Sequence, residues 1–542
     1  MEQLNNILTE EELNAALQEK TQIVAVPTHS RMDSPLLNKL RQKFEITGTV
    51  SIIFGGLFTL GFYKAGIGMN VLFFTAVMVI LLSFVMKQFT IPLKSGTYLY
   101  YGGAVLAGLS TALTANESLQ FMNLILILCL LNLSLLHQLH NTEGWDFLKS
   151  LGKMFGMLFL GIASIGFPIV DGLNFLKKTR LFRSDKSRNI LVGLLISVPV
   201  LWIIIVLLSQ ADMIFGDMTQ GLVEHIFSTE IIAIGFMTLF GFFSCYCILC
   251  GSAAQMGYVD KPRRKGAAST AITVLLLITI IYLFFCGLQI LYLFSNGLFT
   301  LPEGYTFAEY ARRGFFELLA VAVINVTLML IVTSYFEENR FLRILLTVVT
   351  ICTYILIGSA TYRMLLYIGA YHLTFLRLFV LLALLILSFV LAGVIISIYH
   401  KRFPLFRYSV AVITVFYLLF SFAKPDYFIA SYLEEQNETL SAEDADYLTY
   451  ELSLDAAPVV LPLLSDINRW TEAAKQGTEA MIISNEYEIG FMGDLQALDH
   501  YITGYYDKID SEIANRDIRD YNRSVATAID MAVKYPKHYY KR

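Results

Sequence analysis

The stretch YARRGFFELLAVAVINVTLMLIVTSY, residues 310–335, decides the fold class. From residue 315 to 335 it contains a single charged side chain, Glu317, and it is long enough to cross the hydrocarbon core of a bilayer, which takes about 20 helical residues. Arg312 and Arg313 stand directly before this run, where one end of the span would meet the membrane surface. The sequence therefore predicts a membrane-spanning helix with a positively charged entrance and a buried glutamate in its first turn.

Apolar runs of this length recur along the chain, so the predicted fold class is an all-α, polytopic membrane helix bundle. Hydrophobic residues make up 56% of the 542 residues and charged residues only 15%, which is unusual for a soluble protein. The lipid bilayer is the expected surrounding, and nothing in the composition indicates a nucleic-acid partner. We predict about eleven spans. They cover residues 47–63, 69–87, 97–115, 119–137, 190–209, 230–251, 270–294, 315–335, 343–362, 373–399 and 407–423.

The distribution of lysine and arginine predicts the orientation of these spans. Basic residues are retained on the cytoplasmic side, and here they gather before the first span and in alternate connections such as DKPRRK, residues 260–265. Residues 1–46 are therefore expected in the cytoplasm, with a short helix that starts at a capping box formed by Thr9 and Glu12. Eleven crossings of residues 47–423 then place residues 424–542 outside the cytoplasm of the cell membrane.

One apolar segment, residues 153–173, does not fit this alternation. Lys149 and Lys153 precede it, and the six basic residues of LKKTRLFRSDKSR, residues 176–188, lie just after it, so both flanks favour the cytoplasm. Its four glycines and Pro168 are typical of a broken, re-entrant or in-plane segment, which needs protein or water to satisfy its backbone. The alternative is a true span, which would invert the topology of every later helix.

The tail, residues 424–542, differs from the bundle in composition. Acidic residues outnumber basic ones, and apolar residues recur at spacings of three and four, as in ADYLTYELSLDA, residues 445–456. The tail is predicted to be a small extracytoplasmic helical domain, long enough for a core of its own.

Charged groups at the membrane surface are the candidate binding residues. An ionisable side chain at this depth needs a partner or a polar cavity. Arg313 and Glu317 are four residues apart on one helix, with Asn325 on the same predicted face. Arg363 and Arg377 lie on the two arms of a predicted helical hairpin, at similar distances from its turn. We predict an outward-facing site for a small anion or an anionic lipid, because guanidinium groups bind phosphate and carboxylate through paired hydrogen bonds. Its candidate residues are Arg312, Arg313, Arg363, Arg377, Glu317, His372, Tyr310 and Tyr367.

A plainer interpretation of the same residues is also open. The tyrosines would then form an ordinary interfacial belt, the arginines would extend to lipid headgroups, and Glu317 would only neutralise Arg313.

Catalytic and metal-binding patterns are missing from the sequence. It contains no HExxH, no GxSxG and no phosphate-binding loop, and the cysteines of CYCILC, residues 245–250, lie within a predicted span where they favour packing. We therefore predict no catalytic residue, no metal site and no cofactor.

Three motifs carry a family resemblance. They are YARRGFFELLAVAVIN, RMLLYIGAYHLTFLRL of residues 363–378, and a tail pair made of DYFIASY and DADYLTYELSLDAAPVVLPLL. Together they resemble the bacterial multi-spanning membrane proteins grouped under the domains of unknown function 4173 and 4153. The resemblance implies a bacterial envelope protein with no established activity.

Three classes of function remain open. We favour a non-catalytic binding, sensing or accessory protein of the cell envelope, with an envelope or signalling protein as a possible partner. The alternatives are a secondary transporter of a small solute or lipid, whose substrate site the broken segment would help to form, and a membrane-embedded transferase with Glu317 or Asp171 as its base.

Overall fold

The computed structural model describes most of the chain. It covers residues 34–142, 145–178, 229–256, 265–294, 315–436, 442–465, 493–515 and 517–537, together with isolated positions between 190 and 215. The regular elements in these ranges are helices, so the predicted all-α fold class is correct. The predicted capping box at Thr9 lies outside the described residues. A short helix, α2 (Pro35–Gln42), precedes the bundle and is capped by the Ser34 side chain.

Nine helices within the described ranges are long and apolar enough to cross a membrane, which makes the chain a multi-pass membrane protein. Each coincides with a predicted span. A further predicted span is the helix α5 (Ser95–Leu113), which is less apolar and lies beside α6. The predicted span 190–209 falls largely outside the described residues. The nine helices are α3 (Phe44–Phe62), α4 (Met69–Gln88), α6 (Glu117–Leu139), α11 (Thr229–Gln255), α12 (Ala268–Phe294), α14 (Phe315–Tyr335), α15 (Arg340–Tyr371), α16 (Phe375–Tyr399) and α17 (Leu405–Phe422).

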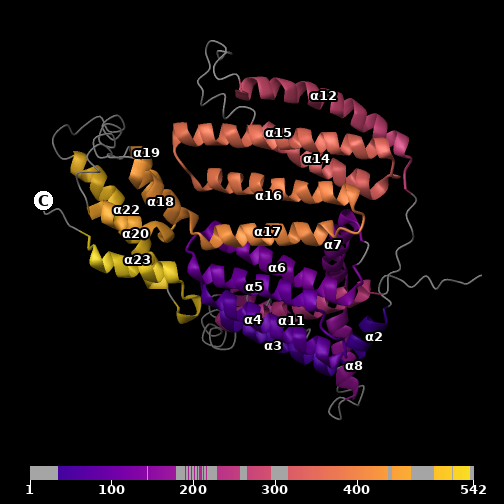
Figure 1. The fold of residues 1–542 in the computed structure, drawn as a ribbon. Coiled ribbons are helices and arrows are strands. Elements are labelled where there is room, and N and C mark those ends of the chain that lie inside the picture. Colours follow the sequence, from indigo (N-terminus) through magenta and orange to yellow (C-terminus); the bar gives the residue numbers. More distant parts are fainter. Residues whose placement is uncertain are drawn as a thin grey trace, which may run out of the picture.

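The bundle consists of two halves with separate cores. The N-terminal half contains α3 to α6 and α11, whose buried residues form one hydrophobic cluster. The C-terminal half contains α12, α14, α15 and α16, which form the other. Figure 1 shows the two halves stacked with α17 between them, and α17 contributes Leu405 to one cluster and Leu418 to the other.

Polar side chains join α17 to the N-terminal half, close to the end of the bundle that carries the tail. The hydroxyl oxygens of Ser110 and Ser421 are 2.6 Å apart, and the Tyr417 hydroxyl donates to Asn123 Oδ1 over 3.0 Å. We call this end of the bundle the tail side and the opposite end the basic end, because Lys94, Arg343 and other cations lie there.

The segment around residues 153–173 is broken, as the sequence predicts. Helix α7 (Phe147–Ala163) and helix α8 (Phe167–Lys178) meet at an angle of 51°. In Figure 1 both run across the direction of the other helices, at the basic end. Helix α7 crosses α11 where Gly161 meets Gly251, so closely that a Cβ on Gly251 would lie 2.4 Å from the Gly161 nitrogen.

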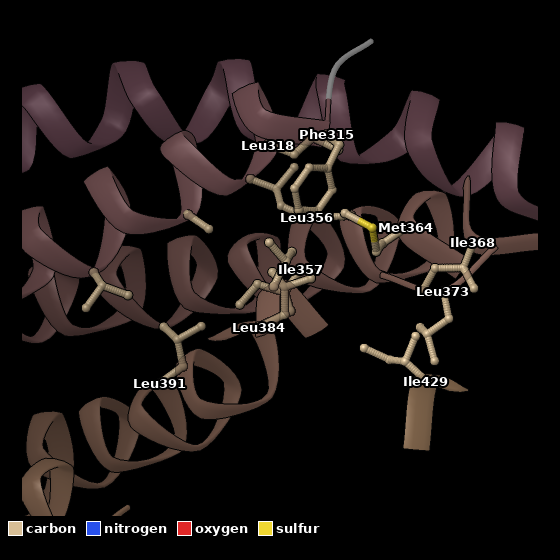
Figure 2. Packing of buried hydrophobic residues seen from close by; sticks show 14 of the residues in the cluster. Phe315, Leu318, Leu356, Ile357, Met364, Ile368, Leu373, Leu384, Leu391 and Ile429 are labelled. Atoms are coloured by element: carbon tan, nitrogen blue, oxygen red, sulfur yellow. The ribbon is translucent and has the colours of Figure 1, made fainter. Parts of the chain in front are cut away.

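The tail is helical in its described parts and packs on the tail side of the bundle (Figure 1). Its buried residues do not form a separate cluster. They continue the core of the C-terminal half, and Figure 2 shows Ile429 of the tail beside Leu373 of the bundle. The tail elements are α18 (Pro425–Gln436), α19 (Ala442–Asp446), the π-helical turn η2 (Tyr447–Glu451), the 3-10 turn η3 (Leu454–Ala456), α20 (Ala457–Ser465), α22 (Gly493–Asn515), the 3-10 turn η5 (Ile518–Asp520) and α23 (Arg523–Lys534).

The tail also binds the N-terminal half, through a set of contacts that we call the tail junction. Asp455 is 2% exposed and accepts hydrogen bonds from the Thr114 hydroxyl and from the Ala115 backbone nitrogen. Farther along, Arg519 donates to the Leu60 carbonyl over 2.7 Å, and Asn522 donates to the Thr114 carbonyl over 2.6 Å. The tail therefore bridges both halves of the bundle.

Candidate functional site

A small apolar pocket lies on the tail side, within the C-terminal half. It is formed where α14 begins, α15 ends and α16 begins, and its volume is about 210 Å³. Figure 2 shows two of its residues, Phe315 and Met364, close together at the edge of the core. We call it the tail-side pocket. It is lined by Phe315, Phe316, Met364, Tyr367, Thr374, Leu376, Arg377 and Val380.

Arg377 supplies the charge of this pocket. Its guanidinium carbon lies 4.3 Å from the centre of the Tyr367 ring, a cation–π contact. Its Nη1 donates to the backbone carbonyls of Tyr371 and His372, at the C-terminal end of α15. A cation is stabilised there because the last carbonyls of a helix lack partners within the helix. The sequence alone gave no sign of this local role for Arg377.

The turn between α15 and α16 connects the pocket to the tail. His372 ends α15 with a φ of 63° in the left-handed region, and its Nε2 lies 3.9 Å from Asp444 Oδ1 of the tail. Two residues before Arg377, the backbone nitrogen of Phe375 donates to the Tyr447 hydroxyl over 2.9 Å. Tyr447 begins the π-helical turn, a distortion frequently found at functional sites.

The structure brings together only part of the predicted site. Tyr367 and Arg377 meet at the tail-side pocket, and His372 lies in the adjacent turn. Arg363 is buried, at 8% exposure, and does not line that pocket, so the predicted pairing of Arg363 with Arg377 across the hairpin is not reproduced there. The other predicted residues, Tyr310, Arg312 and Arg313, lie outside the described residues.

Two expectations about α14 are wrong. Glu317 is exposed on the helix surface rather than buried. Asn325 is fully buried and bonded to Tyr282 and Thr353, so it does not share an exposed face with Glu317. The reason is that α14 turns Phe315, Leu318 and its later apolar residues to the core, and position 317 falls on the other side.

Asp171, the other candidate base, is fully engaged in a structural ion pair. Arg41 of α2 donates from Nε and Nη2 to both carboxylate oxygens, and the Tyr246 hydroxyl donates to Oδ2 over 2.9 Å. Asp171 is 6% exposed. The arrangement joins α2, α8 and α11, and it leaves the carboxylate no open position for a substrate.

A second and larger cavity, about 730 Å³ in volume, lies at the basic end. The N-terminal half forms one wall and the C-terminal half the other, with the start of α17 between them. We call it the basic-end cavity. The sequence does not predict this cavity, because its lining comes from connections far apart in the chain. The available signal is the set of lysines and arginines in the alternate connections, which by themselves indicate only orientation.

Comparison with known proteins identifies a family but no activity. A family model described as a domain of unknown function (DUF4153) matches residues 101–463, which is more than half of the chain. No curated protein and no solved structure matches the chain significantly.

Proposed function

The chain belongs to the DUF4153 family, and we propose that it is a non-catalytic binding protein of the cell envelope that holds an anionic lipid at the tail-side pocket. The observation that carries the proposal is the guanidinium group of Arg377 at an otherwise apolar pocket inside a membrane protein. We also propose that the tail lies outside the cytoplasm, because lysines and arginines gather at the opposite end of the bundle.

The chemistry of the pocket fits an amphiphile with a negative head. Phe315, Phe316 and Leu376 offer an apolar surface to part of an acyl chain, although about 210 Å³ is too small for a whole lipid. Arg377 donates to the two carbonyls from Nη1, and a guanidinium carries further N–H groups on Nε and Nη2 that suit a phosphate. The lipid head would therefore sit over Tyr367, beside the turn.

The contacts of the turn with the tail suggest a sensing role. The hairpin that forms the pocket is held by Asp444 and Tyr447 of the tail, within a few residues of Arg377. A lipid that displaces Arg377 from the end of α15 would shift the turn and with it these two contacts. Binding of a lipid in the pocket would then change the conformation of the tail, and an envelope or signalling protein could bind the altered tail.

The tail junction argues against the alternative of transport. A transporter with its substrate site between the two halves must open on both sides in turn. On the tail side the halves are bridged by Asp455 and Asn522, whose side chains are almost fully buried in bonds to residues 114 and 115. Opening this side would break those buried contacts, so binding is favoured over transport.

The proposal is tested with photoactivatable lipids in native-like membranes. We expect a phosphatidylglycerol probe to label the purified protein near Arg377 more strongly than a phosphatidylcholine probe. Arg377→Gln should reduce the labelling about tenfold, because a charge-assisted hydrogen bond is lost, whereas Arg377→Lys should retain part of it. The matched control is Arg340→Gln, which removes an exposed arginine from the start of α15, far from the end of that helix where Arg377 binds. Equal labelling by both probes, or unchanged labelling of Arg377→Gln, would contradict the proposal.

A further inference from the structure

The basic-end cavity contains more cationic than anionic side chains. Five basic residues and three acidic residues line it, and they come from both halves of the bundle. A cavity of about 730 Å³ lies within the size range of small-molecule sites. The basic residues are Lys265, Arg343, Lys401, Arg402 and Arg407, and the acidic residues are Asp146, Glu337 and Glu338.

The acidic side chains do not neutralise this charge. Glu338 is shared by two cations, because Lys401 Nζ lies 2.9 Å and Arg343 Nη2 3.2 Å from the same carboxylate oxygen, Oε2. The hydrogen bond from Lys401 is the main cause that holds the pKa of Glu338 below its ordinary value, and the hydrogen bond from Arg343 acts in the same direction. Burial raises the pKa of Asp146, which weakens its negative charge. An excess of positive charge is left on the walls.

Arg407 is the cation best placed to meet a ligand. It stands in the first turn of α17, half-buried at the junction of the two walls. The hydrogen bond that the structure assigns to its guanidinium goes to the neutral hydroxyl of Thr142. Next to it, the rings of Phe147 and Phe406 meet edge to face with centres 5.4 Å apart and close one side of the cavity.

An unsatisfied polar atom lies in the same wall. His137 Nδ1 is buried and has no hydrogen-bond partner among the described residues. Its ring packs against Tyr100, with ring centres 5.8 Å apart, and both residues line the cavity. A buried polar atom of this kind is costly unless water or a ligand satisfies it. Cations, an imidazole with an unsatisfied nitrogen and aromatic side chains therefore line one space.

We propose that the basic-end cavity binds an oxyanion, the phosphate or carboxylate group of a small organic molecule, between the two halves of the bundle. Arg407 and Arg402 hold the anion, and the aromatic residues contact the rest of the molecule. The ligand enters from the basic end, because the tail junction joins the halves at the other end. A soluble organic phosphate and the headgroup of a neighbouring lipid share this chemistry. The site is separate from the tail-side pocket, so each proposal can fail without the other.

The test measures the thermal unfolding midpoint of the full chain with added ligands. In detergent, the soluble probes are inorganic phosphate and glycerol 3-phosphate. In nanodiscs, phosphatidylglycerol is compared with phosphatidylcholine. The variants are Arg407→Gln, the more exposed Arg402→Gln, and Ser397→Phe, which fills the cavity without a change of charge. Arg340→Gln is the control, since it removes a charge at the same end but outside the lining.

Three outcomes are possible. A soluble ligand is supported if the soluble probes raise the unfolding midpoint with increasing concentration, and if Arg340→Gln keeps this rise while Arg402→Gln and Ser397→Phe lose it. A lipid headgroup is supported if the midpoint rises only in phosphatidylglycerol nanodiscs and the same two variants lose that rise. No rise with any probe, or an equal rise in all variants as expected from a general salt effect, overturns the proposal. The test remains decisive if Arg407→Gln fails to fold, because Arg402→Gln and Ser397→Phe distinguish the outcomes without it.

Discussion

Asp171 is the clearest case of a charge whose role is structural. It is almost fully buried, both of its oxygens are bonded to Arg41, and the Arg41 guanidinium also lies 4.0 Å from the centre of the Phe167 ring. Asp171→Asn would leave a partly buried guanidinium without its counter-charge. We expect the free energy of unfolding to fall by about 3 kcal/mol, since breaking a buried pair by removing one partner is strongly destabilising. Thermal or denaturant unfolding in detergent measures this change.

An exposed ion pair provides the control for this prediction. Lys64 and Glu230 also form a short contact, 2.5 Å between Nζ and Oε1, but both side chains are more than half exposed. Glu230→Gln should leave the unfolding midpoint unchanged, because solvent screens such pairs. If Asp171→Asn were as stable as Glu230→Gln, the buried pair would not hold α2 and α8 in place.

Exposure of individual charged residues was the least predictable property. The sequence placed Arg377 and Tyr367 near the same predicted hairpin turn, because a short turn between two apolar runs is a local feature. It could not tell that Glu317 faces outward and Arg363 inward, since that depends on which neighbouring helices cover each face. The cap that Arg377 forms at the end of α15 depends likewise on the geometry of the turn.

The crossing of α7 and α11 depends on glycine at the contact. A Cβ on Gly251 would lie 2.4 Å from the nitrogen and 2.6 Å from the Cα of Gly161. Backbone atoms cannot move aside as a side chain would, so Gly251→Val must push the two helices apart. We expect loss of folded protein or a fall of several degrees in the unfolding midpoint, as is common for overpacked contacts.

Another glycine in a spanning helix provides the comparison. A Cβ on Gly358 of α15 would meet nothing within 4 Å. Gly358→Ala should keep or slightly raise the midpoint, because alanine favours a helix more than glycine. Equal effects of Gly251→Val and Gly358→Ala would show that the close crossing is not important for stability.

The helices themselves were the most predictable part of the fold. Apolar runs of about twenty residues locate spans because the bilayer imposes that length, and the glycines with Pro168 located the break between α7 and α8 for local steric reasons. The crossing at Gly251 was not predictable, since a glycine in a span has the same appearance whether or not another helix approaches it.

The tail junction makes the stability of the whole molecule depend on pH. Asp426 of α18 is 1% exposed, and its Oδ2 accepts hydrogen bonds from Asn116 and from the Ser453 backbone. Its Oδ1 is buried and has no partner among the described residues. Burial is the main cause that raises the pKa of Asp426 above its ordinary value of 3.8, and the nearby charge of Asp455 adds to it.

The direction of the pH dependence follows from this raised pKa. The folded state holds the proton of Asp426 more tightly than the unfolded state, so protonation of Asp426 increases the free energy of unfolding. This increase is complete below about pH 3.8 and is lost as the pH rises through the raised pKa of the folded state. Asp426→Asn should remove this part of the dependence, measured as the unfolding midpoint between pH 4 and pH 7. Asp507→Asn changes an exposed aspartate of the tail and is the control. An identical pH profile for Asp426→Asn and the unaltered chain would contradict the prediction.

The tail is predicted to be helical, and its described parts are helical, but its place in the molecule was not predictable. Its apolar spacing indicated helices with a core of their own, whereas Ile429 and its neighbours extend the core of the C-terminal half. Contacts such as Asn522 with Thr114 join residues far apart in the sequence and leave no local pattern. The basic-end cavity was missed for the same reason.

The contacts of the last helix also set an order of events during synthesis. Asn522 and Ser524 bind the carbonyls of Thr111, Thr114 and Leu113, and the first of these bonds spans 411 residues of sequence. Because the ribosome makes the chain from its N-terminus, the turn at residues 111–114 lacks these donors until residues 522 and 524 have been translated. A product terminated before residue 522 would therefore leave the carbonyls of Thr111, Leu113 and Thr114 without these three bonds.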